Sequence, residues 1–181
     1  MTGRSMMRTA TGSGAAPIGG WATPSRAHST PADAERGEAR SASRACRILV
    51  VEDEGLVALE IETFLTGAGH EVVGTAPDRA GAMALARAER PDLALVDMRL
   101  SGGDSGLDLA ADFSALGIPV LFVTGNCPAE EGSAVASAVG CLHKPFDERQ
   151  LLAAVAVAER LTRGGPAPAG RLPGGLHIYR A

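Results

Sequence analysis

Short apolar runs alternate with amphipathic stretches along the middle of the chain. Most of the runs are rich in Val, Leu and Ile, as buried strands are, and they lie at 47–52, 71–75, 92–97, 119–124 and 140–144. Between them apolar residues recur at helical spacing, which predicts helices at 55–69, 78–90, 104–116, 129–140 and 147–161. Asp78 and Asp147 are the expected N-caps of the second and fifth helices. Five such units predict an α/β fold, with helices on both faces of a parallel sheet.

The two ends of the chain lack this pattern. Residues 1–46 are rich in Gly, Ala, Ser, Thr, Pro and Arg without a periodic apolar face, so we expect a disordered N-terminal extension. Residues 164–181 form a Pro/Gly-rich tail, whose apolar-aromatic patch at 176–179 we expect to be a frayed end. The folded domain is therefore expected to span residues 47–163. The tail is too short for a DNA-binding or catalytic output domain, so we expect a domain that acts alone.

Charge is distributed unevenly along the chain. The whole sequence has a net charge of −4, but residues 47–163 hold 9 basic against 18 acidic side chains. An acidic domain is a poor surface for nucleic acid, because phosphates are bound by clustered Lys and Arg. No apolar stretch is long enough to span a bilayer. We therefore expect a soluble, globular protein with neither nucleic acid nor a membrane as its partner.

The three cysteines, Cys46, Cys127 and Cys141, are odd in number and widely separated. Their spacing matches neither a zinc site nor a disulfide framework. We therefore expect a reducing, cytoplasmic compartment. In that setting Cys127 and Cys141 are interpreted as small packing residues and not as redox sensors.

Polar side chains stand at the carboxyl ends of four of the expected strands. Glu52 and Asp53 follow the first strand, Asp97 the third, Thr124 the fourth and Lys144 the fifth. In open α/β sheets, ligands bind at this edge of the sheet. We therefore expect three carboxylates, a hydroxyl and an ammonium group to form one site.

The carboxylates of this expected site repel one another unless a cation lies between them. Mg²⁺ takes oxygen ligands and binds one or two carboxylates together with water and phosphate oxygens. Beside such an ion, Asp97 is suited to attack a phosphoryl group and form an acyl phosphate. The Thr124 hydroxyl and the Lys144 ammonium are suited to bind the phosphoryl oxygens. The residues therefore predict a Mg²⁺-dependent transfer of a phosphoryl group to Asp97.

Four segments on these units carry a resemblance to a known family. They are VVEDE at 50–54, LALVDMRL at 93–100, VLFVTG at 120–125 and HKPF at 143–146. Residues 47–161 resemble the receiver domain of bacterial two-component response regulators. The resemblance implies a flavodoxin-like, doubly wound sheet of five parallel strands in the order 2-1-3-4-5. It also implies that a histidine kinase donates the phosphoryl group.

The resemblance assigns a role to each carboxylate of the expected site. Asp97 is implied to be the phosphoacceptor and a ligand of Mg²⁺. Asp53 is implied to be a direct ligand, and Glu52 to act partly through water. The backbone carbonyl of Arg99 is implied to complete the protein ligands of the ion.

The resemblance also assigns the neutral and basic residues, and here the chain departs from the family pattern. Thr124 is implied to be the switch hydroxyl and Lys144 the family's lysine, with a cis bond to Pro145. The family commonly has an aromatic residue three positions before this lysine, which swings inward on activation, but the chain has Cys141. The loop after Asp97 lacks the common proline.

The segment PVLFVTGN at 119–126 resembles an α-proteobacterial subgroup with a Phe-x-Thr-Gly motif. Members of this subgroup often have an atypical fourth helix, and the thin, Ala/Ser/Gly-rich stretch at 129–139 agrees with that. They work with histidine kinases of the HWE or a related type, so such a kinase is the expected partner. A downstream protein target and a weak homodimer stay open.

Three further features near the site have plain structural interpretations. His143 is expected to be a surface histidine at a strand end. Asp104, Asp108 and Asp112 are expected to form a solvated helix face. Met98, next to Asp97, is a candidate for controlling the access of water to an acyl phosphate.

Two alternatives compete with a stand-alone response regulator. A phosphatase or phosphomutase of the haloacid-dehalogenase type needs a second Asp two residues after its nucleophile, where this chain has Arg99. A receiver-like interaction module that takes no phosphate stays open because of Cys141. We expect a regulator that catalyses only its own phosphorylation and dephosphorylation. It would signal by protein–protein contact or drain phosphoryl groups from its kinase.

Overall fold

A computed structural model describes residues 45–128, 135 and 138–179 of the chain. The disorder expected for residues 1–46 concerns a segment that lies almost wholly outside the described residues. Most of the helix expected at 129–140 lies outside them as well. In the part of the chain that is described, no helix is long and apolar enough to cross a membrane.

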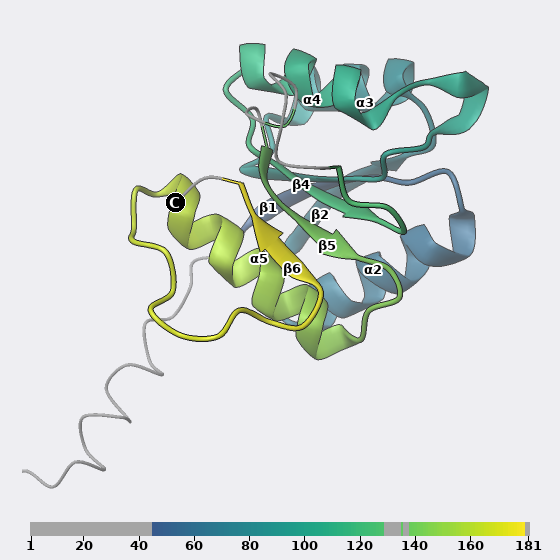
Figure 1. The fold of residues 1–181 in the computed structure, drawn as a ribbon. Helices are drawn as coiled ribbons and strands as arrows, with labels where there is room; N and C mark the ends of the chain where they lie inside the picture. The colour runs from purple at the N-terminus through teal and green to yellow at the C-terminus, as the bar shows by residue number, and fades with distance from the viewer. Residues whose placement is uncertain (1–44, 129–134, 136–137, 180–181) are drawn as a thin grey trace, which may run out of the picture. The chain divides into compact units, whose positions relative to one another are not determined.

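The core of the structure is one six-stranded sheet in the order β2-β1-β3-β4-β5-β6 (Figure 1). The first five strands are parallel, and β6 pairs antiparallel with β5. The expected order 2-1-3-4-5 is therefore confirmed, with one strand added at the outer edge. The strands are β1 (Arg47–Val51), β2 (Glu71–Ala76), β3 (Leu93–Val96), β4 (Val120–Thr124), β5 (Ala138–His143) and β6 (Leu176–Ile178).

Helices cover both faces of this sheet, as the doubly wound fold requires. One face carries α2 and α5, and the opposite face carries α3 and α4 (Figure 1). A short 3-10 helix, η1, precedes α4 in the loop after β3. The helices are α2 (Gly55–Gly67), α3 (Arg79–Glu89), η1 (Ser101–Gly103), α4 (Gly106–Ala115) and α5 (Glu148–Thr162).

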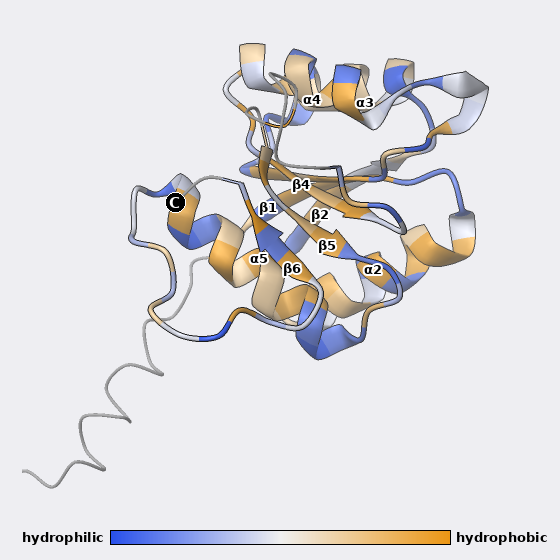
Figure 2. Ribbon diagram, viewed as in Figure 1, coloured by the Kyte–Doolittle hydropathy of each residue, from blue (hydrophilic) through white to orange (hydrophobic). Residues whose placement is uncertain are grey.

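Successive residues of each central strand point to opposite faces, so the sheet separates two hydrophobic clusters. Ile48 and Val50 of β1 belong to the cluster under α2 and α5. Leu49 and Val51 belong to the cluster under α3 and α4. Figure 2 shows the hydrophobic residues concentrated along the central strands. Each of these fully buried side chains contributes about 1.5–3 kcal/mol, which is why both layers of helices are held firmly to the sheet.

The two expected N-caps are confirmed. The Asp78 side chain accepts a hydrogen bond from the backbone N–H of Gly81, at 2.8 Å, at the start of α3. Asp147 and Gln150 form a reciprocal capping box at the start of α5. Both caps satisfy backbone N–H groups that the first turn of a helix leaves without a partner.

The tail of the chain is not a frayed end, which corrects our expectation for residues 176–179. Its short strand β6 pairs with Gly140, Cys141 and Leu142 of β5. A Cβ atom at position 140 would overlap the carbonyl oxygen of His177, so only glycine allows β6 to come this close. β5 begins at Ala138, so the last residues of the stretch that we expected to be helical belong to a strand.

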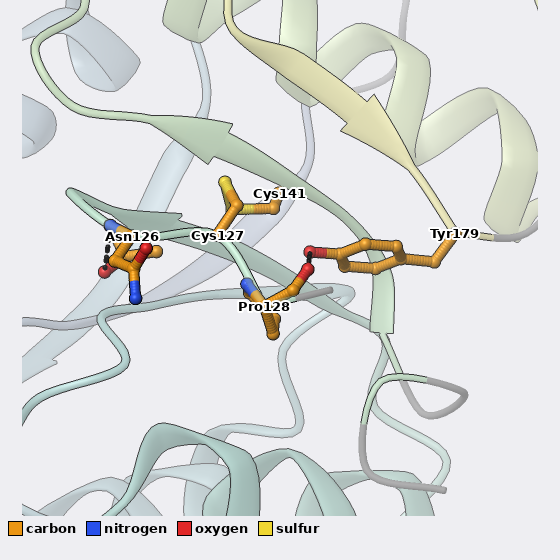
Figure 3. Close-up of a disulfide and its surroundings, with 6 residues drawn as sticks. Asn126, Cys127, Pro128, Cys141 and Tyr179 are labelled. Carbon is orange, nitrogen blue, oxygen red and sulfur yellow. Dashed lines mark hydrogen bonds between the residues drawn. A yellow bond between two sulfur atoms is a disulfide. The ribbon is translucent and has the colours of Figure 1, made fainter. Parts of the chain in front are cut away.

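A disulfide joins Cys127 to Cys141, which corrects our interpretation of these residues as unpaired packing residues (Figure 3). Cys127 follows β4 and Cys141 lies within β5, and these two strands are neighbours in the sheet. Cys141 is in register with Phe122, so the loop after β4 must return toward β5 to bring Cys127 to Cys141, a path that the spacing of cysteines along the chain does not reveal. Cys46 stays a free, buried thiol.

Candidate functional site

Three carboxylates meet at the carboxyl ends of β1 and β3. Glu52 and Asp53 follow β1, Asp97 follows β3, and one oxygen from each lies within 4.8 Å of the others. Glu52 and Asp97 are buried, whereas Asp53 is exposed. The sheet brings them together because β1 and β3 are hydrogen-bonded neighbours, so the strands end side by side. The predicted acidic cluster is thus present.

Lys144 bridges the two buried carboxylates. Its Nζ atom lies 2.6 Å from Oε2 of Glu52 and 2.7 Å from Oδ2 of Asp97. The lysine follows β5, and its backbone N–H donates to the carbonyl oxygen of Thr124 at 2.8 Å. The peptide bond to Pro145 is cis, as expected. One ammonium group therefore balances part of the charge that burial would otherwise make costly.

The environment pushes the pKa values of the two buried carboxyls in opposite directions. Burial raises the pKa of Asp97, but the hydrogen bond and charge of Lys144 outweigh burial, so this pKa lies below its usual value. In Glu52, burial outweighs Lys144 and the charge of Asp97 adds to it, so the pKa is raised. Asp97 is therefore firmly ionised at neutral pH, while Glu52 holds its charge less readily.

The same two carboxylates also shift the pKa of Lys144. Burial lowers it, but the hydrogen bonds and negative charges of Asp97 and Glu52 raise it by more, and the net pKa lies above the usual value. The ammonium group thus stays protonated across the physiological range.

The loop after Asp97 contributes backbone groups to the site. The N–H of Arg99 donates to Oδ1 of Asp97 at 3.2 Å, and the N–H of Gly106 donates to the carbonyl of Met98 at 2.9 Å. A Cβ atom at position 106 would overlap the carbonyl oxygen of Asp97, so α4 can start this close to the site only with glycine. Ser101 Oγ lies 3.4 Å from Oδ2 of Asp53. Neither Ser101 nor Gly106 was predicted to support the site.

Thr124 lies at the end of β4 and is buried, with 2% of its surface exposed. Its hydroxyl oxygen accepts a long hydrogen bond from the backbone N–H of Asn126, at 3.5 Å, and its hydroxyl helps to lower the pKa of Asp97. Asn126 directly precedes Cys127 in the loop after β4 (Figure 3). The predicted hydroxyl is thus present beside Asp97, and the loop behind it is tied to β5.

The donor set fits a small, hard divalent cation. Three carboxylates supply oxygen ligands, and the exposed Asp53 leaves one side of the cluster open to solvent. A single ammonium group, Lys144, faces two of the three acids, so a net negative charge remains. Mg²⁺ prefers such oxygen ligands and keeps several waters.

Other predicted residues lie near the site without joining it. His143 is exposed at the end of β5. Asp112 pairs with Arg79, whose backbone N–H also donates to Asp104 at 3.1 Å, so part of the expected solvated face links α4 to α3. Met98 is partly buried next to Asp97. The side chain of Arg99 is exposed, and no acid stands in the place where a dehalogenase-type phosphatase needs one.

A doubly wound parallel sheet with a strand-end aspartate, an acidic pair and a lysine before a cis proline defines the class of receiver-like signalling domains. Comparison with known families agrees, because the model of the response regulator receiver domain matches residues 48–156. The chain belongs to this family.

Curated relatives are similar over the same region. The phyllosphere-induced regulator PhyR of Methylorubrum extorquens is 40% identical over 92 residues, which cover 50% of this chain and 34% of PhyR. The transcriptional regulatory protein PdtaR of Mycobacterium tuberculosis is 32% identical over 115 residues, which cover 62% of this chain and 56% of PdtaR. The chain thus spans about a third to just over half of the length of these relatives.

A solved structure shows the same fold. The solution structure of the PhyR receiver domain from Erythrobacter litoralis has a TM-score of 0.55 and is 26% identical to this chain. The match covers 70% of this chain and 97% of that domain. The likeness therefore extends over a complete receiver domain.

Proposed function

We propose that the chain is a response regulator that accepts a phosphoryl group from a histidine kinase on Asp97. The observation that carries this proposal is the arrangement around Lys144, whose ammonium group contacts both Asp97 and Glu52 beside the open carboxylate of Asp53. An ionised, partly buried carboxylate beside a fixed cation is suited to attack phosphorus.

In the proposed reaction, Oδ2 or Oδ1 of Asp97 forms a bond to the phosphorus of a phosphohistidine. The bond between phosphorus and the imidazole nitrogen breaks, and its electron pair stays on that nitrogen. Lys144 turns part of its contact from Asp97 to a phosphoryl oxygen, and the Thr124 hydroxyl donates to another. Both groups lie beside Asp97, and we expect Thr124 to shift toward the phosphoryl oxygen once the group is transferred.

Glu52, Asp53, Asp97 and the backbone carbonyl of Arg99 are the groups that would hold Mg²⁺. When bound, the ion neutralises charge on the phosphoryl oxygens. Glu52 suits a position near the ion because burial raises its pKa by more than the ammonium group of Lys144 lowers it, so a further cation would favour its charged form. Asp53 is the most accessible of the three acids, which fits a direct ligand at the solvent side.

The output is proposed to leave by protein–protein contact, or the chain drains phosphoryl groups from its kinase. A kinase of the HWE or a related type is proposed as the partner because the segment at 119–126 resembles the Phe-x-Thr-Gly subgroup. We also propose a cytoplasmic location, where the kinase would donate its phosphoryl group. We propose no direct contact with nucleic acid, because residues 47–163 are acidic. A weak homodimer is compatible with this proposal.

The test is phosphorylation of the full chain by an HWE-type kinase in the presence of Mg²⁺. The wild type is expected to take up labelled phosphate, and Asp97→Asn is expected to lose it because an amide cannot form the acyl phosphate. Asp108→Asn changes an exposed acid of α4 and serves as the matched control, with labelling as in the wild type. Labelling that persists in Asp97→Asn contradicts the assignment.

The second candidate is a receiver-like module that takes no phosphate, and the Cys127–Cys141 disulfide at the position of the usual aromatic residue favours it. Beryllofluoride, a mimic of the phosphoryl group, separates the two. Mg²⁺-dependent binding of beryllofluoride supports the response regulator. No binding in either redox state of the chain supports the module.

A further inference from the structure

The disulfide joins the loop that follows Thr124 to β5. Cys127 is three residues after Thr124, and Cys141 lies in the middle of β5, with 5.9 Å between the two Cα atoms (Figure 3). The Cys141 side chain is fully buried, whereas Cys127 is partly exposed. Cys127 is therefore the half of the disulfide that lies nearer to solvent.

The same loop is held by a second contact from the end of the chain. The hydroxyl of Tyr179 donates to the carbonyl oxygen of Pro128 at 3.0 Å (Figure 3). The backbone N–H of Tyr179 donates to the carbonyl of Val139 in β5, also at 3.0 Å. Two consecutive residues of the loop, Cys127 and Pro128, are thus joined to the β5–β6 edge, one by a covalent bond and one by a hydrogen bond.

We propose that Cys127 and Cys141 form a reversible redox site that controls how far the loop after Thr124 can move when the site binds a phosphoryl group. This inference rests on the proposed function for its signalling consequence. The disulfide itself does not depend on it. The cytoplasmic location belongs to the proposed function, and in that reducing setting a disulfide persists only transiently and serves catalysis or sensing.

The chemistry needs a small thiol as the co-reactant. Its thiolate attacks Sγ of Cys127, the bond to Cys141 breaks, and the electron pair leaves on Sγ of Cys141, which takes a proton. A second thiol releases Cys127 from the mixed disulfide. In sum, two small thiols are oxidised to one disulfide, and the protein disulfide is reduced to two thiols. Oxidation is the reverse, with a small-molecule disulfide as the oxidant.

The two redox states differ in the freedom of the loop. In the oxidised state the covalent bond fixes Cys127 to β5, so the segment from Gly125 to Cys127 can shift only as far as its two anchored ends allow. In the reduced state no covalent bond joins the loop to β5, while the hydrogen bond from Tyr179 to Pro128 stays available. The shift of Thr124 toward a phosphoryl oxygen moves this loop, so the shift costs more in the oxidised state. Reduction is therefore coupled to phosphoryl binding.

The first measurement establishes the redox site itself. The full chain is treated with reduced or oxidised glutathione and is then denatured and alkylated. Its mass, measured by mass spectrometry, gives the number of alkylated cysteines. We expect three alkyl groups on the reduced chain and one, on Cys46, on the oxidised chain. A chain that keeps three free thiols after oxidation, or that cannot be reduced without denaturation, overturns the proposal.

The second measurement tests the coupling. Beryllofluoride affinity in the presence of Mg²⁺ is compared between the two redox states of the wild type, so no substitution is required. We expect the reduced chain to bind at least about fivefold more tightly, the lower end of common coupling strengths. Equal affinity, or tighter binding by the oxidised chain, overturns the proposal. Cys46→Ala, which leaves the pair intact, should keep the difference, and Cys127→Ser should abolish it.

A third measurement separates failure of this inference from failure of the proposed function. If neither state binds beryllofluoride, the proposed function fails, and the redox site is judged by hydrogen exchange of the Gly125, Asn126 and Cys127 amides. We expect these amides to exchange at least about fivefold faster after reduction, the same lower bound as for the difference in beryllofluoride affinity. Unchanged exchange overturns the proposal independently of phosphoryl binding.

Discussion

At the scale of single residues, the position of each site side chain was predictable because parallel strands end at one edge of a sheet. Asp53, Asp97 and Lys144 each follow an apolar run that forms a strand. These strands are parallel, so the three residues lie at the same edge of the sheet. The sequence could not show that Lys144 contacts two acids at once, because that depends on side-chain directions. Nor could it show the support from Ser101 and Gly106, which comes from the path of a loop.

Glu52→Gln separates the role of this acid in ion binding from its role in stability. The raised pKa of Glu52 means that its charged form is disfavoured in the folded protein, so the free energy of unfolding at pH 7 should stay the same or rise. Mg²⁺ affinity should fall by about 10–100-fold, as for lost outer ligands. Isothermal titration calorimetry and urea unfolding check the two effects. The exposed Glu60→Gln is the control, and a large loss of stability in Glu52→Gln would contradict the expectation.

The buried thiol of Cys46 gives a prediction about pH. Burial and a hydrogen bond with Glu159 raise its pKa from 9.0 to about 12. The stability that this thiol contributes is therefore complete below pH 9 and is lost as the pH rises toward 12. At pH 9, alkylation in the native chain should be slower than in urea by a factor on the order of 100 or more, because only the thiolate reacts. Mass spectrometry of a time course measures this, and equal rates would refute it.

At the scale of elements, the five parallel strands and four of the five expected helices are present, because apolar residues recur in them at strand or helix spacing. β5 starts two residues earlier than expected, within the stretch that was assigned to a helix at 129–140. The strand β6 was missed because three residues carry too little pattern to be told from a frayed end. The sequence feature that indicates β6 is Gly140 of the neighbouring strand, because a glycine there leaves room for the backbone of His177. The disulfide was missed because it depends on the path of the loop after β4, which brings Cys127 back to Cys141 in β5.

Gly140→Val should detach β6 from the sheet. The added side chain overlaps the backbone of His177, so Leu176 loses its burial and Tyr179 its hold on Pro128. Loss of the buried Leu176 alone should lower the free energy of unfolding by about 1.5–3 kcal/mol. Hydrogen exchange of the 176–178 amides and urea unfolding check this. Gly170→Ala, at a position with open space, is the control. Protected amides in Gly140→Val would show that β6 tolerates the side chain.

At the scale of the whole molecule, the disulfide links two parts of the chain that are 14 residues apart. Closing a segment of this length restricts the unfolded chain, so reduction should lower the free energy of unfolding by about 3 kcal/mol. Urea unfolding with and without a reductant measures the difference. The double variant Cys127→Ser/Cys141→Ser should not respond to the reductant. A wild type that is equally stable in both states would contradict the expectation.

The strand β6 also has a consequence for contacts between molecules. An uncovered β5 would offer a row of unpaired backbone groups, on which the strand of another polypeptide can add. Here the chain covers that edge with its own end, and the new outer strand is only three residues long, which makes it a poor template for further addition. A protein cut before residue 176 would present β5 as an open edge, with Gly140 free to admit a foreign backbone, and would therefore be prone to self-association through its sheet.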